Sequence, residues 1–487
     1  MNLTLDLSWW QLALMLLDYG IKFAMIGVVP SDRRPSSANA WLLLILLLPV
    51  VGLPLYLMMG SNFVSRRRHR IQTAAKSELV NVHAGIADLL EGSRLSRDVE
   101  ELVHLNRALT GFPAVPATVR HLWTDYDLTM MRIAELIDSA QSFVDIEIYA
   151  VARDRTTQRV FDAIERATAR GVHVRLLFDH IGSMKYPGYR KMRRHLLDIG
   201  VDCHRMLPLD PLRGRWRRPD LRNHRKIIIV DGHIGMLGSF NLIDRTYLLR
   251  KHRRAGRRWV DAFVEIEGPI VTSLESMFAV DWYTESDERI DLEPPSAETG
   301  DNIVQLVPSG PGYQAEPNLR MFNTLVNHAR DRLVLCSPYF VPDATLLEAI
   351  LTACYRGVHV DLLVSEKADQ FMVHHAQSSY YEELLDAGVH IWEFPAPYVL
   401  HTKFALADPH DDRSVGVFGS SNMDMRSFTL NYESSLFIAD GPLLGQLTTL
   451  TNTYLAVSKR LTRETWLKRP WYRRYIDNVM KLTSALQ

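Results

Sequence analysis

Apolar and polar positions follow two alternating patterns beyond residue 117. "SFVDIEIYAV" (142–151) and "VHVRLLFD" (172–179) are short apolar runs rich in β-branched residues, which is typical of buried strands. Between them, "TTQRVFDAIERATARG" (156–171) spaces its apolar residues three and four apart, as an amphipathic helix does, and Gly171 marks its end. Strands separated by helices predict an α/β fold with a mixed sheet flanked by helices.

The same order of elements occurs twice. "RGVHVRLLFDHIGS", from Arg170, matches "RGVHVDLLVSEKAD", from Arg356, and "DIGVDCHRM", from Asp198, matches "DAGVHIWEF", from Asp386. A repeat of this length is too long for a solenoid and indicates two fused domains. We expect one domain over 118–295 and a duplicate over 296–487, both α/β.

The N-terminus has a different pattern. Residues 9–29 and 41–59 are apolar runs, each long enough to cross the roughly 30 Å hydrocarbon core of a bilayer as a helix. Asp18 and Lys22 lie four residues apart in the first run, where they can pair. No cation precedes this run, which argues against a cleaved signal peptide. Residues 1–65 are therefore predicted to form a membrane region with two transmembrane helices.

Charge close to these runs predicts their orientation. "SRRRHR" (65–70) follows the second run, whereas the loop between the runs has only Arg33 and Arg34. The larger cationic cluster stays inside, so the N-terminus and the C-terminal domains are expected in the cytoplasm. The polar segment 66–117 is predicted to be a helical connector.

Composition adds little about partners but does suggest a compartment. The 56 basic and 56 acidic residues cancel, so overall charge indicates no partner. Three cysteines without a C-x-x-C pair argue against a disulfide framework or a zinc site, and suit a reducing cytoplasm.

The candidate chemistry lies in one set of polar residues that the chain contains twice. "RNHRKIIIVDGHIGMLGSFN" (222–241) and "LHTKFALADPHDDRSVGVFGSSN" (400–422) have the same order of side chains. The set consists of His224, Lys226, Asp231 and Asn241 in the first copy, and of His401, Lys403, Asp408 and Asn422 in the second. Residues two apart on a strand share a face, so each His and Lys project together. Asp231-Gly232 has the composition of a tight turn, so this Asp is expected to brace the motif.

Two imidazoles, two ammonium groups and two amides suit an anionic substrate that needs both a nucleophile and an acid. A phosphodiester fits: a neutral His attacks phosphorus to give a phosphohistidine, and the protonated partner donates to the leaving oxygen. Lysines and asparagines stabilise charge on the other oxygens. No carboxylate cluster suited to magnesium occurs in the sequence, so neither a metal nor a cofactor is expected. Metal binding by the adjacent His374 and His375 is a weaker interpretation, because neighbouring histidines usually face apart.

The paired H-x-K-x4-D motifs, together with "SPYFVPD" and "SSNMDMRSF", resemble the phospholipase D superfamily, and most closely the bacterial cardiolipin synthases. This resemblance covers nearly the whole chain and implies that two phospholipase D-like domains form one active site. It implies transfer of a phosphatidyl group between two phosphatidylglycerol molecules, giving cardiolipin and glycerol. By the same analogy, His224 is the nucleophile and His401 the general acid.

The resemblance also implies roles for individual side chains. The catalytic residues would be His224, Lys226, Asp231, His401, Lys403 and Asp408. Asn241, Asn422, Ser239 and Ser420 would bind the substrate phosphate. Asp261 and Glu433 would orient the histidines; alternatively, each is only a carboxylate at the start of a strand.

Other functions remain open at this point: a phospholipase, a membrane-tethered nuclease, or a non-catalytic anion-binding protein. The apolar N-terminus and the basic, aromatic tail "WLKRPWYRRYIDNVMKLTSAL" (466–486) favour lipid over nucleic acid. Phosphatidylglycerol, cardiolipin and the membrane are the expected partners, and the bacterial inner membrane the expected location. Four arginines between 213 and 218 are expected to line the mouth of the site. The pattern leaves open the oligomeric state, the second lipid donor, and the roles of the basic segment 250–259 and of the insertion 409–414.

Overall fold

The computed structural model describes residues 8–31, 35–60, 71, 86, 95–210, 218–292, 300–313 and 315–482. The predicted cationic cluster 65–70, most of the predicted connector and Arg213, Arg215 and Arg217 lie outside these residues. The chain divides into two compact units, Met1–Arg66 with Arg217–Asp220, and Arg67–Trp216 with Leu221–Gln487. They are called the apolar unit and the catalytic unit below.

The apolar unit is helical. Its elements are α1 (Trp9–Val28), α2 (Pro35–Leu47), α3 (Pro49–Leu55) and the π-helical η1 (Tyr56–Gly60). Among the described residues, α1 is the one helix long and apolar enough to cross a membrane, with a mean hydropathy of 1.4. Lys22 and Asp18 pair on it at 2.7 Å, as their spacing predicted.

The second predicted span is not a straight helix. Leu48 leaves the helical conformation, with φ −132° and ψ 66°, because Pro49 lacks the N–H that a continuous helix needs and instead begins α3. The rings of Trp41 and Tyr56 contact each other with centroids 5.7 Å apart. In one straight helix these residues would be roughly 22 Å apart along the axis. Residues 41–59 therefore do not form one continuous helix in the structure, and the segment folds back on itself; a second membrane crossing stays a prediction.

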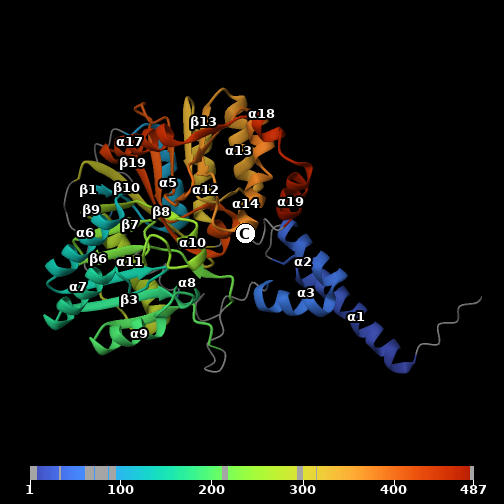
Figure 1. The fold of residues 1–487 in the computed structure, drawn as a ribbon, viewed down its shortest axis with the longest axis horizontal. Helices are drawn as coiled ribbons and strands as arrows, with labels where there is room; N and C mark the ends of the chain where they lie inside the picture. Colours follow the sequence, from blue (N-terminus) through green and yellow to red (C-terminus); the bar gives the residue numbers. More distant parts are fainter. Residues whose placement is uncertain are drawn as a thin grey trace, which may run out of the picture. The chain divides into compact units, whose positions relative to one another are not determined.

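A single mixed sheet forms the centre of the catalytic unit (Figure 1). Its strand order is β20-β14-β13-β11-β16-β17-β19-β10-β1-β9-β7-β6-β2-β3-β4, and β5 pairs with β19. In the first half the strands are β1 (Ala114–Trp123), β2 (Phe143–Ile148), β3 (His173–Asp179), β4 (Asp202–Met206), β5 (Arg222–Asn223), β6 (Ile227–Val230), β7 (Ile234–Gly238), β8 (Arg258–Val260) and β9 (Phe263–Glu267). In the second they are β10 (Asn302–Ser309), β11 (Arg332–Cys336), β12 (Phe340–Val341), β13 (His359–Ser365), β14 (His390–Phe394), β15 (Tyr398–Leu400), β16 (Phe404–Ala407), β17 (Val415–Gly419), β18 (Met423–Asp424), β19 (Asn431–Asp440) and β20 (Lys459–Leu461).

Helices complete each half. The first half has α6 (Tyr126–Ser139), α7 (Gln158–Ala169), α8 (His180–Met184), α9 (Tyr189–Asp198), α10 (Arg250–Arg254) and α11 (Ile270–Ser286). The second half has α12 (Pro317–His328), α13 (Ala344–Tyr355), α14 (Phe371–Ser378), α15 (Tyr381–Ala387), α16 (Met425–Thr429), α17 (Pro442–Val457), α18 (Arg463–Leu467) and α19 (Trp471–Lys481). Helix α5 (Arg97–Thr110), which precedes the first half along the chain, packs its apolar residues into the core of the second half.

The duplication is visible in the sheet. Strands β2, β3, β4, β6, β7 and β9 of the first half correspond in order to β11, β13, β14, β16, β17 and β19 of the second. The two halves meet where β1 pairs with β10 in antiparallel orientation. Each half has its own apolar core, between its strands and α6, α7 and α9 in the first half and between its strands and α5, α12, α13 and α15 in the second. The predicted mixed α/β fold with a duplicated domain is thus confirmed, and the pairing of β1 with β10 makes the two halves one body.

Candidate active site

Both histidine-lysine motifs lie at the seam between the halves. His224 and Lys226 lie between β5 and β6, and His401 and Lys403 lie between β15 and β16. The residues leading into each motif pair with the other half, because β5 joins β19 and β15 joins β8. The backbone N–H of His224 donates to the carbonyl of Tyr432 at 2.8 Å, and that of His401 donates to Val260 at 2.7 Å. The fold therefore brings the two motifs together from positions 177 residues apart in the sequence.

Each histidine is paired with a carboxylate of the opposite half. His224 Nδ1 lies 3.1 Å from Glu433 Oε1. His401 Nδ1 lies 2.5 Å from Asp261 Oδ1. A carboxylate that accepts the Nδ1 proton fixes the ring and its tautomer, and leaves the lone pair on Nε2. This geometry supports the predicted histidine-orienting role of Asp261 and Glu433, and it adds that the pairing is crosswise.

The two motif serines hold these carboxylates. Ser239 Oγ donates to Asp261 at 2.6 Å and accepts the N–H of Ala262. Ser420 Oγ donates to Glu433 Oε2 at 2.6 Å and accepts the N–H of Ser434. A hydroxyl has one proton to donate, so neither serine retains one for a substrate phosphate. In this structure both serines position a carboxylate, and the phosphate-binding role expected from the sequence stays a prediction.

Asp231 and Asp408 brace the scaffold instead of facing the histidines. Asp231 accepts the backbone N–H groups of Gln141, Ser142 and Phe143, each at 2.8 Å, where β2 begins. Asp408 does the same at the start of β11. Both residues have positive φ, as their tight-turn positions require. The bracing role predicted for Asp231 agrees with this geometry.

The two lysines are buried beside the histidines. Lys226 Nζ donates to the carbonyl of His224 at 2.5 Å, and Lys403 Nζ donates to that of His401 at 2.5 Å. An ammonium group has three protons, so each lysine has donors left for a bound anion.

The two motif asparagines differ. Asn241 accepts the N–H of Ala150 through Oδ1 and donates to the hydroxyl of Tyr247, so one amide proton remains. Asn422 Oδ1 is buried and has no hydrogen-bond partner among the described residues. The side-chain oxygen of Asn422 therefore lacks the kind of hydrogen bond that holds the side-chain oxygen of Asn241.

Burial lowers the pKa of both imidazoles. It lowers the pKa of His224 to about 4, and the nearby charge of Lys226 adds to this effect. Burial and Lys403 lower the pKa of His401 in the same way. Burial also lowers the pKa of Lys226 to about 8, and burial together with Lys226 lowers that of Lys403 to about 7. A neutral His224 with a free Nε2 lone pair meets the requirement for a nucleophile.

These pKa values predict a loss of kcat/KM at alkaline pH. A lysine attracts a phosphodiester only while protonated, and the protonated fraction falls as pH rises above the pKa in the folded protein. Because kcat/KM reports the free enzyme, we expect it to decline as pH increases through about 7 to 8. Lys403→Arg keeps its charge throughout this range and should move the decline to higher pH. A pH profile between 5 and 9 with a soluble substrate tests this, and a profile unchanged by Lys403→Arg contradicts it.

Several residues at the site were not predicted from the sequence. The ring of Tyr149, at the end of β2, lies 4.6 Å from that of His224, and the ring of Tyr247 lies 6.4 Å from that of His401. Arg225 forms a buried ion pair with Asp281, and its Nε donates to the backbone carbonyl of Glu433 at 3.2 Å. Tyr149 lies near the end of the apolar run 142–151, which could have marked it as a residue close to the strand's carboxyl end.

Two other histidine groups lie apart from the motif. His375 bonds Asp477 at 2.6 Å, so it serves packing between α14 and α19. Among the described residues, His359, Asp361 and His390 form a group that could hold a metal ion. Arg332 and Trp392 already donate to the Asp361 carboxylate.

Known proteins resemble this chain in sequence and in fold. The family described as "Cardiolipin synthase, PLD-like domain" matches residues 133–282 and 322–454, and "Phospholipase_D-nuclease N-terminal" matches residues 22–60. Cardiolipin synthase A of Serratia proteamaculans (strain 568) is 32% identical over 499 residues, covering 99% of this chain and 98% of the relative. The cardiolipin synthase A of Yersinia pseudotuberculosis serotype O:1b (strain IP 31758) is 33% identical over 475 residues, covering 95% of each chain.

A solved structure shares the fold at low sequence identity. The phosphatidylserine synthase of Haemophilus influenzae Rd KW20 superposes with a TM-score of 0.59 at 14% identity, over 79% of this chain and 99% of that protein. The relatives match this chain over nearly its full length, and the family model matches both halves. Each half also supplies the carboxylate that pairs with the histidine of the other. This chain therefore belongs to the cardiolipin synthase family of phospholipase D-like proteins.

Proposed function

We propose that this chain is a phosphatidyltransferase that makes cardiolipin and glycerol from two molecules of phosphatidylglycerol. The observation that supports it most strongly is the pair of buried histidines, each oriented by a carboxylate from the opposite half. Two oriented imidazoles supply both the nucleophile and the proton donor of a two-step transfer. The names of the relatives supply the substrate class.

In the first step, His224 Nε2 attacks the phosphorus of one phosphatidylglycerol. The bond between phosphorus and the glycerol oxygen breaks as His401 donates a proton to that oxygen, so glycerol leaves. His401 acts here in its protonated form, which its pairing with Asp261 stabilises. The phosphatidyl group is then covalently attached to His224. Lys226 and Lys403 stabilise the non-bridging oxygens, and their burial strengthens this interaction.

In the second step, His401 acts as a base. It takes the proton from the terminal hydroxyl of a second phosphatidylglycerol, whose oxygen attacks the phosphorus on His224. The phosphorus–nitrogen bond breaks, cardiolipin is released, and His401 is protonated for the next cycle. One phosphodiester replaces another of the same kind, so the reaction needs no nucleotide.

Mass action gives a test that separates transferase from hydrolase. Protein in vesicles with labelled phosphatidylglycerol should form cardiolipin and equimolar glycerol, with little phosphatidic acid. Excess glycerol should drive labelled cardiolipin back to phosphatidylglycerol, because the free energies of the two sides are similar. Each product is quantified by thin-layer chromatography and mass spectrometry. Phosphatidic acid as the main product, with cardiolipin unaffected by glycerol, would show a phospholipase instead.

We also propose that the apolar unit is a multi-pass anchor in the bacterial inner membrane and that the catalytic unit lies in the cytoplasm. Helix α1 supports the anchor, and the cationic segment 65–70 supports the orientation. A second crossing requires residues 35–60 to open from the folded-back arrangement. An impermeant maleimide should then label Trp9→Cys and Tyr355→Cys from the same, cytoplasmic side. Labelling from opposite sides would mean that only α1 crosses.

A further inference from the structure

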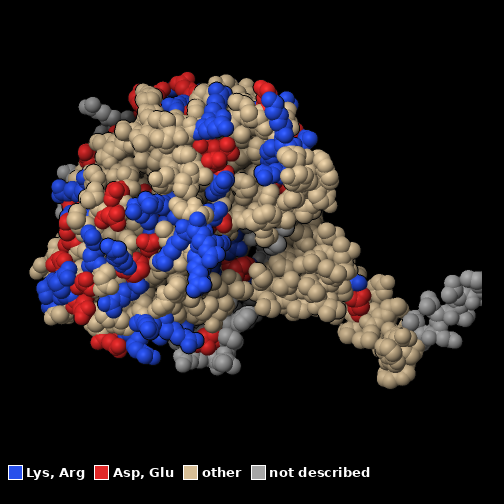
Figure 2. Space-filling view, in the orientation of Figure 1, with Lys and Arg blue, Asp and Glu red and all other residues tan. Residues whose placement is uncertain are grey.

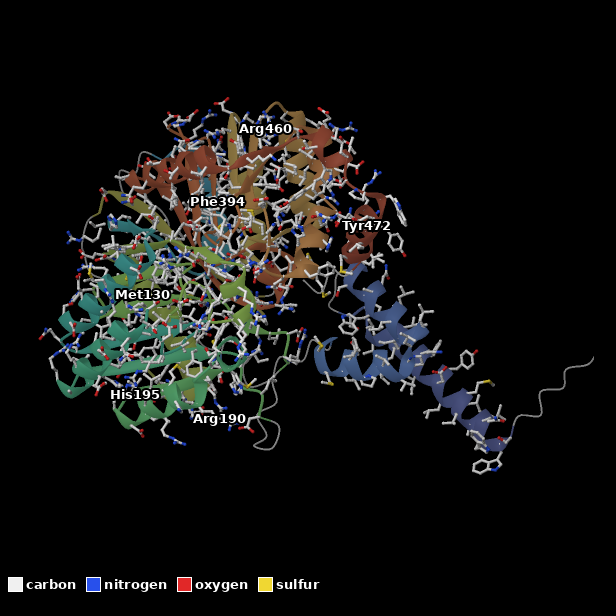
Figure 3. All side chains as sticks on the ribbon, in the orientation of Figure 1. Met130, Arg190, His195, Phe394, Arg460 and Tyr472 are labelled. Atoms are coloured by element: carbon white, nitrogen blue, oxygen red, sulfur yellow. The ribbon has the colours of Figure 1, made fainter. Side chains whose placement is uncertain are left out.

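The last helix, α19, exposes an apolar stripe to solvent. Trp471, Tyr475, Val479 and Leu482 follow one another at intervals of four, four and three residues, so they lie on one side of the helix. Trp471 is 74% exposed and Tyr475 is 65% exposed. Tyr472 also lies on the outer side of the helix in Figure 3. An exposed apolar stripe on a basic helix is typical of an interfacial helix.

The opposite side of α19 fixes the helix to the body. Asp477 is buried, accepts a hydrogen bond from His375 on α14 at 2.6 Å, and forms an ion pair with Arg469. Met480 packs against the core of the second half. Because this inner side already anchors the helix, the outer stripe is not needed for packing among the described residues.

The start of α14 extends the apolar surface toward the active site. Phe371 is 66% exposed and Met372 is 46% exposed, on the helix against which α19 packs. Just before Phe371, Asp369 accepts the hydroxyl proton of Tyr339 at 2.7 Å, and the Ala368 carbonyl accepts a hydrogen bond from Arg257.

Arg257 connects this surface to the catalytic histidine. Two residues further along the chain, Trp259 stacks beside Tyr247, with ring centroids 4.5 Å apart, and Tyr247 contacts the ring of His401. Arg257 and Trp259 therefore link the segment before α14 to the ring of Tyr247, which contacts the catalytic His401.

Cationic side chains lie on and around α19 and on α10, the helix just before Arg257. Residues 468–482 contain five Lys or Arg residues and one Asp. Helix α10, which ends three residues before Arg257, exposes four more cations: Arg250, Lys251, Arg253 and Arg254. Figure 2 shows Lys and Arg side chains gathered over the position of α10. Cations beside aromatic residues complement an anionic lipid surface.

We propose that α10, residues 371–372 and the outer side of α19 form a contact face that rests on an anionic phospholipid bilayer. Trp471, Tyr475, Phe371 and Met372 enter the boundary between headgroups and acyl chains, and the cations bind lipid phosphates. The catalytic mouth is thereby held at the level where phosphatidylglycerol headgroups lie. This inference rests on the proposed lipid substrate, but it can be tested by a depth measurement that requires no turnover.

The test uses spin labels on the full chain in vesicles of phosphatidylglycerol and phosphatidylcholine. Single cysteines replace Trp471, Tyr475 and Phe371 in a background without the three native cysteines. The control is Tyr355→Cys on α13 of the same half, where Tyr355 is 77% exposed. Labels on the contact face should collide more with oxygen than with a water-soluble nickel chelate, and the control label should show the reverse. A contact-face label that behaves as the control does overturns the proposal. A label shielded from both reagents also overturns it, because protein then covers the face.

Kinetics give an independent readout. Trp471→Ala/Tyr475→Ala should raise KM for phosphatidylglycerol in vesicles about tenfold at unchanged kcat. Turnover of a monomeric short-chain phosphatidylglycerol should not change. An equal loss on both substrates, or no change on vesicles, contradicts the contact face. If no variant or wild-type protein makes cardiolipin while the depth pattern holds, the proposed function fails and the contact face stands.

Discussion

His224→Ala is expected to lower kcat for cardiolipin formation by about 10⁴-fold or more, because no other group can take the phosphatidyl group. Its neutral, buried imidazole is oriented by Glu433, and the other imidazole of the site, His401, already serves as the proton donor in the same step. The measurement is initial rate on labelled phosphatidylglycerol in vesicles. Thermal unfolding of the variant serves as the control for folding.

His401→Ala should be equally inactive in turnover but should differ in a trapping experiment. Without the proton donor, the adduct on His224 forms slowly, and it then persists because no base activates the second hydroxyl. Rapid acid-free digestion and mass spectrometry should find a phosphatidyl group on His224 in His401→Ala. An adduct on His401 in the wild-type protein would reverse the two roles.

Glu433→Gln is expected to lower kcat about 10³-fold at unchanged thermal stability. Ser420 donates to one oxygen of Glu433, so a Gln at this position should keep its carbonyl toward Ser420 and turn its NH2 toward His224. His224 Nδ1 must then accept a hydrogen bond from this NH2, so the single ring proton lies on Nε2 and the attacking lone pair is lost. The measurement is kcat together with adduct formation.

Asp261→Asn is the matched control for the crosswise pairing. Asp261 lies in the first half but orients His401, so its amide variant should still form the adduct on His224 and fail in the second step. Glu433→Gln lies in the second half but should prevent adduct formation on His224. If the two variants behave the other way round, each carboxylate serves the histidine of its own half and the pairing described here is wrong.

The sequence predicted the repeat, the mixed α/β fold and both motifs, because these depend on short-range patterns. Gly171, for example, ends α7 with a φ of 86°, and Asp231 occupies the tight turn that its Asp-Gly pair indicated. The insertion 409–414 lengthens the turn between β16 and β17. Such features need only a few neighbouring residues to be recognised.

Other features depend on contacts that a linear pattern does not contain. Which carboxylate meets which histidine is set by the docking of β8 on β15 and of β5 on β19, far apart in the chain. The direction of the Ser239 hydroxyl depends on where Asp261 lies once folded. The fold-back of residues 41–60 depends on local geometry at Leu48, where a proline in a membrane helix could also have been accommodated.

The antiparallel pairing of β1 with β10 affects how activity should depend on protein concentration. A protein assembled from two separate copies of one half would lose its composite centre as its concentration fell below the dissociation constant. Here both copies belong to one polypeptide, so the effective concentration of one half relative to the other is high and does not change on dilution. Specific activity should therefore stay constant as the number of protein molecules per vesicle is reduced to one, and the two copies are free to diverge, as Asp261 and Glu433 already have.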